Sequence, residues 1–257
     1  MRIDGSVALV TGANRGLGRV FARELVSRGA ARVYGAARHP DTVTEPGVTP
    51  VALDITDADR VAQVAQQCAD VSLLVNNAGV LNISTFISAP SLDAARAEME
   101  VNYFGTLSMC RAFAPVLAAN GGGAIVNMLS VTSFYTNLID ASYGASKAAE
   151  WSLTNGIRLE LHHQSTLVVA VHASFIDTDM AAMTNAPKDS PRVGRPAGIR
   201  RRRGRPGRGA RRRADPDHQG TAVTRSGADL PAPPEVLGRR AQGRQLACHS
   251  AHKHTSE

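Results

Sequence analysis

The stretch Thr11-Gly12-Ala13-Asn14-Arg15-Gly16-Leu17-Gly18 leads from a short apolar run at residues 6–11 into an amphipathic segment at about 17–28. A short apolar run that ends at glycine is typical of a buried parallel strand. The amphipathic segment has apolar residues at helical spacing, and Gly29 marks its end. The sequence therefore predicts a strand, a tight glycine-rich turn and a helix.

The same alternation continues along the chain. Five more short apolar runs predict strands, at residues 32–37, 51–53, 71–75, 124–128 and 167–171. Three longer segments predict helices, at about 57–68, 91–119 and 143–162. Such alternation implies a doubly wound α/β fold, in which helices cover both faces of a parallel sheet through right-handed crossovers. Ligands of these folds bind at the carboxyl ends of the strands.

The charge of the chain divides sharply near residue 190. Residues 1–190 carry 13 Lys and Arg against 17 Asp and Glu, whereas residues 191–257 carry 16 against 5. The second segment has eleven Arg between Pro191 and Arg213 and no Phe, Tyr or Trp. It cannot bury enough apolar surface to offset the entropy of ordering. We predict one folded domain at 1–190 and a disordered basic tail at 191–257.

Two explanations of this tail compete. Arg, Pro, Gly and Ala dominate it, and their codons are GC-rich, so the composition favours an out-of-frame translation of a GC-rich gene. The alternative is a genuine basic arm that binds nucleic acid, because dense arginines neutralise phosphates. The tail has no aromatic side chains to stack on bases, which argues against sequence-specific RNA recognition. Three histidines near Cys248 lack a folded frame, so we predict no metal site.

The cysteines and the amino-terminal residues bear on the compartment. The three cysteines show no metal or redox spacing and leave one unpaired, so a disulfide framework is not expected. The first residues run straight into the strand pattern, with no long apolar segment or small-residue cleavage site. This argues against export and membrane spanning, and we predict a cytoplasmic protein.

The glycine turn suits a pyrophosphate, because glycines allow close backbone approach and the amino-terminal end of a helix attracts anions. A plain tight turn is the alternative. Arg38 stands twenty residues past Gly18, where an NAD-binding chain has a carboxylate for the ribose 2′-hydroxyl. An arginine suits a 2′-phosphate instead, and Arg15 can reach the same group. The sequence predicts NADP(H) over NAD(H), with two solvated surface arginines as the alternative.

Tyr143 and Lys147 lie four residues apart in a predicted helix and so share one face. A cation beside a partly dehydrated phenol lowers the pKa of that phenol and lets it act as a base. A solvated surface pair is the alternative. Reduction of a ketone needs a proton donor and a second hydrogen-bond donor at the carbonyl oxygen, where negative charge grows. Tyr143 and Ser130 are the candidates for these two donors.

Residues 6 to about 180 resemble the short-chain dehydrogenase/reductase family, which has a Rossmann-type fold. Six signals of the family occur in order: the glycine turn at 11–18, Asp54, Asn-Asn-Ala-Gly at 76–79, Asn102, Ser130, and Tyr-x-x-x-Lys at 143–147. The resemblance implies that Tyr143 is the general acid/base and that Lys147 binds the nicotinamide ribose and lowers the pKa of the phenol. It also implies that Ser130 polarises the substrate carbonyl and that Asn102 helps to hold a water relay.

The resemblance further implies a set of cofactor-binding residues: Thr11, Gly12, Asn14, Arg15, Gly16, Leu17, Gly18, Arg38, Asp54, Asn76, Ala78, Gly79, Tyr143, Lys147, Ile176 and Thr178. In this set Asp54 faces the adenine and Thr178 contacts the nicotinamide carboxamide. Structural alternatives exist, because Ser130 can cap a strand end, Asn102 can be an ordinary helix residue and Asp54 a turn residue. For Asn76 we favour a structural tie between strands.

The chain departs from the family pattern in two places. Where the family has Pro-Gly after the sixth strand, this chain has Ala173-Ser174, whose side chains can crowd the backbone near the nicotinamide. Beyond Pro191 the resemblance ends, so the usual substrate-covering helix and last strand are not recognisable. Three apolar residues just past Ser130 are expected to wall a substrate pocket, with core packing as the alternative. They are Phe134, Tyr135 and Leu138.

We predict an oxidoreductase that transfers a hydride between NADP(H) and the carbonyl or secondary alcohol of a small molecule. The alternatives are an NADP(H)-binding sensor without turnover and a nucleic-acid-associated protein that uses the basic tail. Family members pair through two long helices, here 91–119 and 143–162, so the resemblance implies a homodimer.

Overall fold

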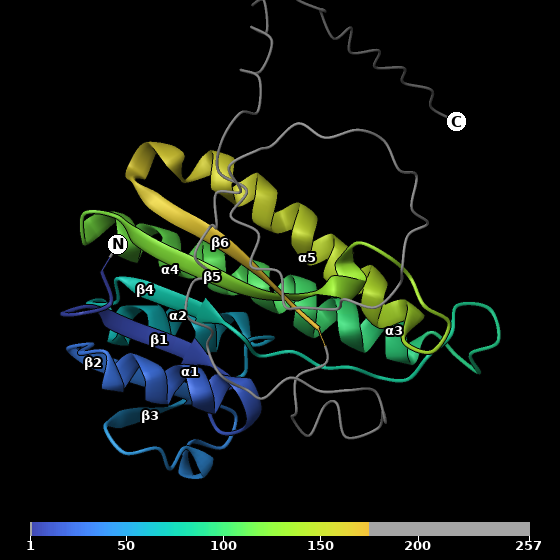
Figure 1. The fold of residues 1–257 in the computed structure, drawn as a ribbon, viewed down its shortest axis with the longest axis horizontal. Coiled ribbons are helices and arrows are strands. Elements are labelled where there is room, and N and C mark those ends of the chain that lie inside the picture. Colours follow the sequence, from blue (N-terminus) through green and yellow to red (C-terminus); the bar gives the residue numbers. More distant parts are fainter. Residues whose placement is uncertain (1, 175–257) are drawn as a thin grey trace, which may run out of the picture. The chain divides into compact units, whose positions relative to one another are not determined.

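The computed structural model describes residues 2–174 (Figure 1). They contain one sheet of six strands: β1 (Val7–Thr11), β2 (Arg32–Ala37), β3 (Val48–Ala52), β4 (Leu73–Asn76), β5 (Gly123–Ser130) and β6 (Thr166–Ala173). All neighbours pair in parallel, in the order β3-β2-β1-β4-β5-β6. The predicted doubly wound α/β fold is confirmed. The predicted site residues Ile176 and Thr178 and the tail at 191–257 lie outside the described residues.

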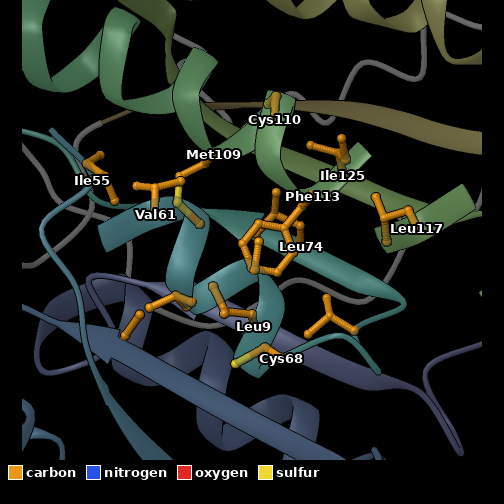
Figure 2. Close-up of a cluster of buried hydrophobic side chains, with 14 of the residues drawn as sticks. Leu9, Ile55, Val61, Cys68, Leu74, Met109, Cys110, Phe113, Leu117 and Ile125 are labelled. Carbon is orange, nitrogen blue, oxygen red and sulfur yellow. The ribbon is translucent and has the colours of Figure 1, made fainter. Parts of the chain in front are cut away.

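Helices cover both faces of the sheet. The main ones are α1 (Gly16–Ser27), α2 (Ala58–Gln67), α4 (Thr106–Ala119) and α5 (Ala141–Glu160). Alternate residues of β1 point to opposite faces, so Ala8 and Val10 pack with Leu25 of α1 in one buried cluster. Leu9 belongs to a second cluster, which α2, α4 and α5 close and in which Phe113 of α4 is fully buried (Figure 2). Both faces of β1 are therefore buried, as its continuous apolar run predicts.

The third strand begins earlier than predicted, at Val48 rather than residue 51. Pro50 lies within it and pairs in register with Gly35 of β2. A proline cannot donate a ladder hydrogen bond, but it is tolerated at the edge of a sheet, and β3 is the edge strand. Its edge position, which the sequence does not reveal, explains the difference.

The single helix predicted at 91–119 is wrong in detail. It consists of α3 (Asp93–Glu98), a π-helical segment at Met99–Gly105 and α4. A π-helical turn holds one more residue than an α-helical turn, so it rotates the faces of the helix that follow. The apolar spacing in the sequence does not reveal this change. Asn102 lies in this widened segment. No helix within residues 2–174 is long and apolar enough to cross a membrane.

Candidate active site

The predicted site residues within 2–174 lie on segments near the carboxyl ends of the strands. The strand order places β2 and β4 on opposite sides of β1, so the chain reverses its direction of winding there. Such a switch point opens a crevice at the carboxyl ends of the strands. The glycine turn follows β1, the Asn-Asn-Ala-Gly stretch begins at the end of β4, and Ser130 ends β5. The fold thus brings three segments far apart in the sequence to the same edge.

The glycine turn is tightly packed and needs its glycines. Gly12 and Gly16 have positive φ angles of 65° and 50°, which residues with side chains rarely adopt. A Cβ atom on Gly18 would lie 2.1 Å from the carbonyl oxygen of Gly12. The first turn of α1 holds no acidic residue, and Arg15 makes no side-chain cap hydrogen bond at its start. This turn can accept an anion at the amino-terminal end of α1.

Hydrogen bonds join the glycine turn to the loop after β4. The Thr11 hydroxyl oxygen accepts from the backbone N–H groups of Asn77 and Ala78 at 2.9 and 3.0 Å. The Asn77 amide donates back to the carbonyl oxygen of Thr11 at 3.0 Å. Asn76 donates to Asn127 of β5 at 2.9 Å, which matches the structural tie that we favoured for it. These residues set the shape of the crevice, while Asn14 and Leu17 lie half-buried in the same turn.

A recess separate from the crevice at the glycine turn lies at the ends of β2 and β3. It has a volume of about 490 Å³ and is lined by Arg38, His39, Ala52, Leu53, Asp54 and Arg60. Asp54 accepts hydrogen bonds from the backbone and hydroxyl of Thr56, at 3.0 and 2.7 Å. The backbone bond lowers the pKa of Asp54 most strongly, burial opposes it, and the Thr56 hydroxyl and the charge of Arg38 add to the lowering. Asp54 is therefore ionised and also shapes the turn.

His39 and Arg60 also line this recess, and neither was among the predicted site residues. Arg60 donates from Nε to the carbonyl oxygen of Ala52 at 2.8 Å, which holds its side chain over the end of β3. Arg38, His39 and Arg60 give the recess a basic rim, which suits a phosphate on a ribose. The position of Arg60 in the first turn of α2 carries no motif by itself, so only the tertiary structure shows its proximity to Arg38.

Tyr143 and Lys147 are both buried, with 8% and 5% of their surface exposed. The Lys147 Nζ atom lies 5.9 Å from the centroid of the Tyr143 ring. The alternative of a solvated surface pair is therefore wrong. Lys147 donates to the carbonyl oxygen of Met128 at 2.8 Å and to Glu150 at 2.6 Å. Its ammonium is therefore held between α5 and β5 and is not exposed to solvent.

Burial raises the pKa of Tyr143, and the ammonium of Lys147 pulls it down. The negative charge of Glu150 opposes Lys147, and a hydrogen bond with Ser130 lowers the pKa further. The net direction in the protein alone is upward. The prediction that Lys147 acidifies Tyr143 has the right sign for that one interaction, but desolvation outweighs it, since a phenolate is poorly stabilised away from water.

The hydroxyl of Ser130 faces Tyr143. The Ser130 hydroxyl oxygen accepts from the backbone N–H and the hydroxyl of Thr132, at 3.2 and 2.9 Å. Both bonds use lone pairs, so the hydroxyl hydrogen of Ser130 is left to donate to the phenol oxygen of Tyr143, which is the hydrogen bond that lowers the pKa of that phenol. The capping role that was the alternative for Ser130 is present, because its hydroxyl accepts from Thr132 at the start of the 3₁₀ turn Val131–Ser133.

Asn102 uses both ends of its amide to hold neighbouring segments. Its Oδ1 atom accepts from the backbone N–H of Val80 at 2.8 Å. Its Nδ2 atom donates to the carbonyl oxygen of Val80 and to the hydroxyl of Ser146, both at 2.9 Å. A Cβ atom on Gly79 would lie 3.1 Å from Asn102 Oδ1 and 3.7 Å from Lys147 Nζ. Asn102 therefore anchors the loop after β4 to α5, beside the Lys147 ammonium.

A buried histidine that the sequence analysis did not single out supports the end of β5. The Nδ1 atom of His172 on β6 lies 2.8 Å from the Ser133 hydroxyl and 3.3 Å from the Ser130 carbonyl oxygen. Its ring stacks on Phe134 at 4.2 Å and meets Trp151 edge to face at 4.8 Å. Burial lowers the pKa of His172, while the Ser130 backbone opposes this. His172 is thus a rigid neutral support beneath Ser130.

The apolar residues past Ser130 face outward. Phe134, Tyr135 and Leu138 are 59%, 49% and 78% exposed, so they are not core residues, although the Phe134 ring also packs on His172. An isolated bridge joins Ser84 to Asp140, which brings the loop after β4 next to the loop before α5. Ile87 on the first of these loops is also exposed. These apolar side chains are therefore exposed on the two loops that the bridge joins.

A parallel sheet with a glycine turn at its switch point, and a buried Tyr-Lys pair at the same edge, is the arrangement of a dinucleotide-binding oxidoreductase. The family model described as short chain dehydrogenase matches residues 6–189. The chain belongs to the short-chain dehydrogenase family, whose members are NAD(P)-dependent oxidoreductases.

Individual relatives agree with this assignment. A sorbitol dehydrogenase from Cereibacter sphaeroides is 35% identical over 191 residues, which are 69% of this chain and 73% of that protein. A 3-oxoacyl-[acyl-carrier-protein] reductase from Thermotoga maritima is 30% identical over 192 residues, or 70% and 78% of the two chains. A crystal structure of a short chain dehydrogenase from Burkholderia cenocepacia in complex with NADP is 45% identical, with a TM-score of 0.73 over 75% of this chain and 81% of that one.

Proposed function

We propose that the protein is an NADP(H)-dependent enzyme that reduces a carbonyl group of a small molecule or oxidises the corresponding secondary alcohol. The observation that carries the proposal is the joint burial of Tyr143 and Lys147 beside Ser130, at the same edge as the glycine turn. The hydroxyls of Tyr143 and Ser130 can both donate hydrogen bonds to one substrate oxygen. Related proteins that act on a polyol and on a 3-oxoacyl group are consistent with this reaction class.

The proton-handling residues fit carbonyl reduction. NADPH, when bound, supplies the hydride. Tyr143 is protonated at neutral pH, because a phenol ordinarily ionises near pH ~10 and burial raises its pKa further. It can therefore give a proton to the oxygen on which negative charge develops. Ser130 can turn its hydroxyl hydrogen from the Tyr143 phenol to the same substrate oxygen. Met128 and Glu150 hold the Lys147 ammonium in place. Its positive charge stays beside Tyr143 after the phenol has given up its proton.

The basic rim of the recess at the ends of β2 and β3 supports NADP(H) over NAD(H). Arg38 and Arg60 line it, and Arg15 lies in the neighbouring glycine turn, exposed like Arg38. A bound 2′-phosphate has two negative charges more than a ribose hydroxyl, so cations there favour it. The Burkholderia cenocepacia relative was crystallised with NADP. Steady-state kinetics with both cofactors test this: we expect a higher kcat/KM for NADPH, and a preference for NADH would overturn the assignment.

The sensor alternative differs from the enzyme in one measurable way. Ala173 and Ser174 stand where the family has Pro-Gly. If these side chains obstruct the nicotinamide, the protein will bind NADPH tightly but will not oxidise it with any carbonyl in a broad panel. We expect turnover, followed through the loss of NADPH absorbance, with the full chain and with a variant that ends at residue 190. Retention of only the full chain on DNA would instead support the nucleic-acid alternative.

We also propose that two copies pair through the outer face of α4 and α5. A groove of about 840 Å³ runs between these helices, and apolar residues such as Leu107, Leu153 and Leu161 line it. Gly156 lies in the groove, and a Cβ atom added to it would meet nothing within 4 Å. A helix face with open space at glycine lets a second copy of the same face approach closely. Light scattering on the purified protein would measure the expected dimer mass.

A further inference from the structure

Glu150 lies almost one helical turn after Lys147 on α5 and is only 1% exposed. Its Oε2 atom accepts from Lys147 Nζ at 2.6 Å. The other carboxylate oxygen is 3.4 Å from the hydroxyl of Thr106 on α4. A buried ion pair adds little net stability, because removing two charges from water offsets most of their attraction. The pair therefore calls for a role other than holding α5 in place.

Hydrogen bonds around Glu150 tie this turn of α5 to β5. Its backbone carbonyl accepts from the Thr154 hydroxyl at 2.7 Å, and Thr154 in turn accepts from Asn127 of β5 at 2.9 Å. Burial raises the pKa of Glu150, and the Lys147 ammonium opposes that rise. Burial lowers the pKa of Lys147, but Glu150 and Tyr143 outweigh it, so the lysine stays protonated. The two side chains form a fixed ion pair beneath the phenol.

The groups that shift the pKa of Tyr143 come from α5, from β5 and from the loop before α5. Lys147 and Glu150 lie on its own helix, Ser130 ends β5, and Asp140 precedes α5. Lys147 and Ser130 favour the phenolate, whereas Glu150 and Asp140 oppose it. Glu150 also faces Cys110 on α4, whose pKa is raised to about 12 by burial first and then by Glu150, so that thiol is uncharged. Lys147 therefore acts on Tyr143 as half of a neutral pair rather than as an isolated cation.

We propose that Glu150 is a positioning residue for proton transfer: its carboxylate aims the Lys147 ammonium at Tyr143 and offsets the charge of that ammonium, so that the phenol keeps its proton and serves as the acid in carbonyl reduction. The proposal rests on the oxidoreductase function proposed above. On this proposal, Glu150 helps to set the pH at which Tyr143 loses its proton.

The substitution Glu150→Gln tests this, because glutamine keeps the volume and the oxygen acceptor but removes the charge. The readout is the absorbance of tyrosinate in a pH titration of the full chain, with Tyr143→Phe variants subtracted to isolate Tyr143. We expect the midpoint of Tyr143 to fall by about one pH unit, as loss of a like charge predicts. An unchanged or higher midpoint would overturn the proposal. If the glutamine variant does not fold, the uncharged Glu150→Met variant gives the same comparison.

Two controls separate charge from structure. Glu24→Gln removes a half-exposed carboxylate on α1 and should leave the Tyr143 midpoint unchanged. Glu150→Asp keeps the charge, so its midpoint should stay nearer to the wild type than to Glu150→Gln. A purely structural Glu150 would lower the melting temperature without moving the phenol midpoint, which contradicts the proposal.

The pH profile of NADPH oxidation gives a second readout. In Glu150→Gln the loss of carbonyl reduction at high pH should begin about one pH unit lower than in the wild type. If the wild type turns over no carbonyl, the proposed function fails, but the titration of Tyr143 still decides whether Glu150 sets its midpoint.

Discussion

Gly18 and Gly12 lie so close together that a Cβ atom on Gly18 would be 2.1 Å from the carbonyl oxygen of Gly12. The same atom would be 2.5 Å from the Asn77 amide nitrogen. We therefore expect Gly18→Ala to destabilise folding by about 2 kcal/mol, because backbone atoms have little room to move away. Chemical denaturation would measure this, and NADPH affinity should fall with it.

The matched control for Gly18 is Gly156→Ala on α5. Its Cβ atom would meet nothing within 4 Å, and it lies in a helix. Alanine in such a position stabilises a helix by about 0.5–1 kcal/mol. Equal destabilisation by both substitutions would show that crowding at Gly12 is not the cause.

Arg38 is expected to decide between the two cofactors. Arg38→Asp replaces a cation at the rim of the recess with a carboxylate that suits a ribose 2′-hydroxyl. Loss of a charge-assisted hydrogen bond should raise KM for NADPH about 10- to 100-fold and lower it for NADH. The exposed Arg23→Asp on α1 changes the same charge away from the recess and should leave both constants unchanged. If Arg38→Asp behaves like Arg23→Asp, Arg38 does not contact the cofactor.

Tyr143→Phe should lower kcat by about 100-fold or more, since it removes the proton donor and leaves the ring in place. NADPH affinity, measured by fluorescence titration, should change little. Tyr34→Phe on β2 removes a hydroxyl that pairs with Arg32 and Asp70 far from Ser130, and its kcat should match the wild type. Undiminished turnover in Tyr143→Phe would exclude this tyrosine as the acid.

The raised pKa of Tyr143 also makes stability depend on pH. The phenol ionises at higher pH in the folded protein than in the unfolded chain, where the value is about 10. Its contribution is therefore complete below the unfolded value and is lost as pH rises towards the folded one. Above about pH 10, the melting temperature of the wild type should fall more steeply than that of Tyr143→Phe. Parallel curves would mean that burial does not raise this pKa.

The dimer prediction uses the open space at Gly156. Gly156→Arg should leave each subunit folded, because nothing lies within 4 Å of the added Cβ atom, but it should fill the groove between α4 and α5. Light scattering should then give a monomer, whereas Gly156→Ala should remain a dimer. A dimer of unchanged stability in Gly156→Arg would place the interface elsewhere.

The fold was predictable because its signals are local. The apolar runs that became β1, β4 and β5 and the glycines that end helices can be read from neighbouring residues alone. The same holds for the order of the glycine turn, Ser130 and the Tyr-Lys pair. Errors occurred where no local signal exists. The edge position of the strand that carries Pro50 depends on the strand order, and the π-helical segment that carries Asn102 leaves the apolar spacing unchanged.

The sequence by itself determined which chemical groups the protein has and the order in which they reach one edge of the sheet. Only the tertiary structure decided their charge states and partners, because these depend on burial and on side chains from other elements. Lys147 illustrates this: its spacing from Tyr143 is sequence information, but its ion pair with the buried Glu150 exists only because α5 packs against α4 and β5. The electrostatics of a site arise from exclusion of water, which no short stretch of sequence contains.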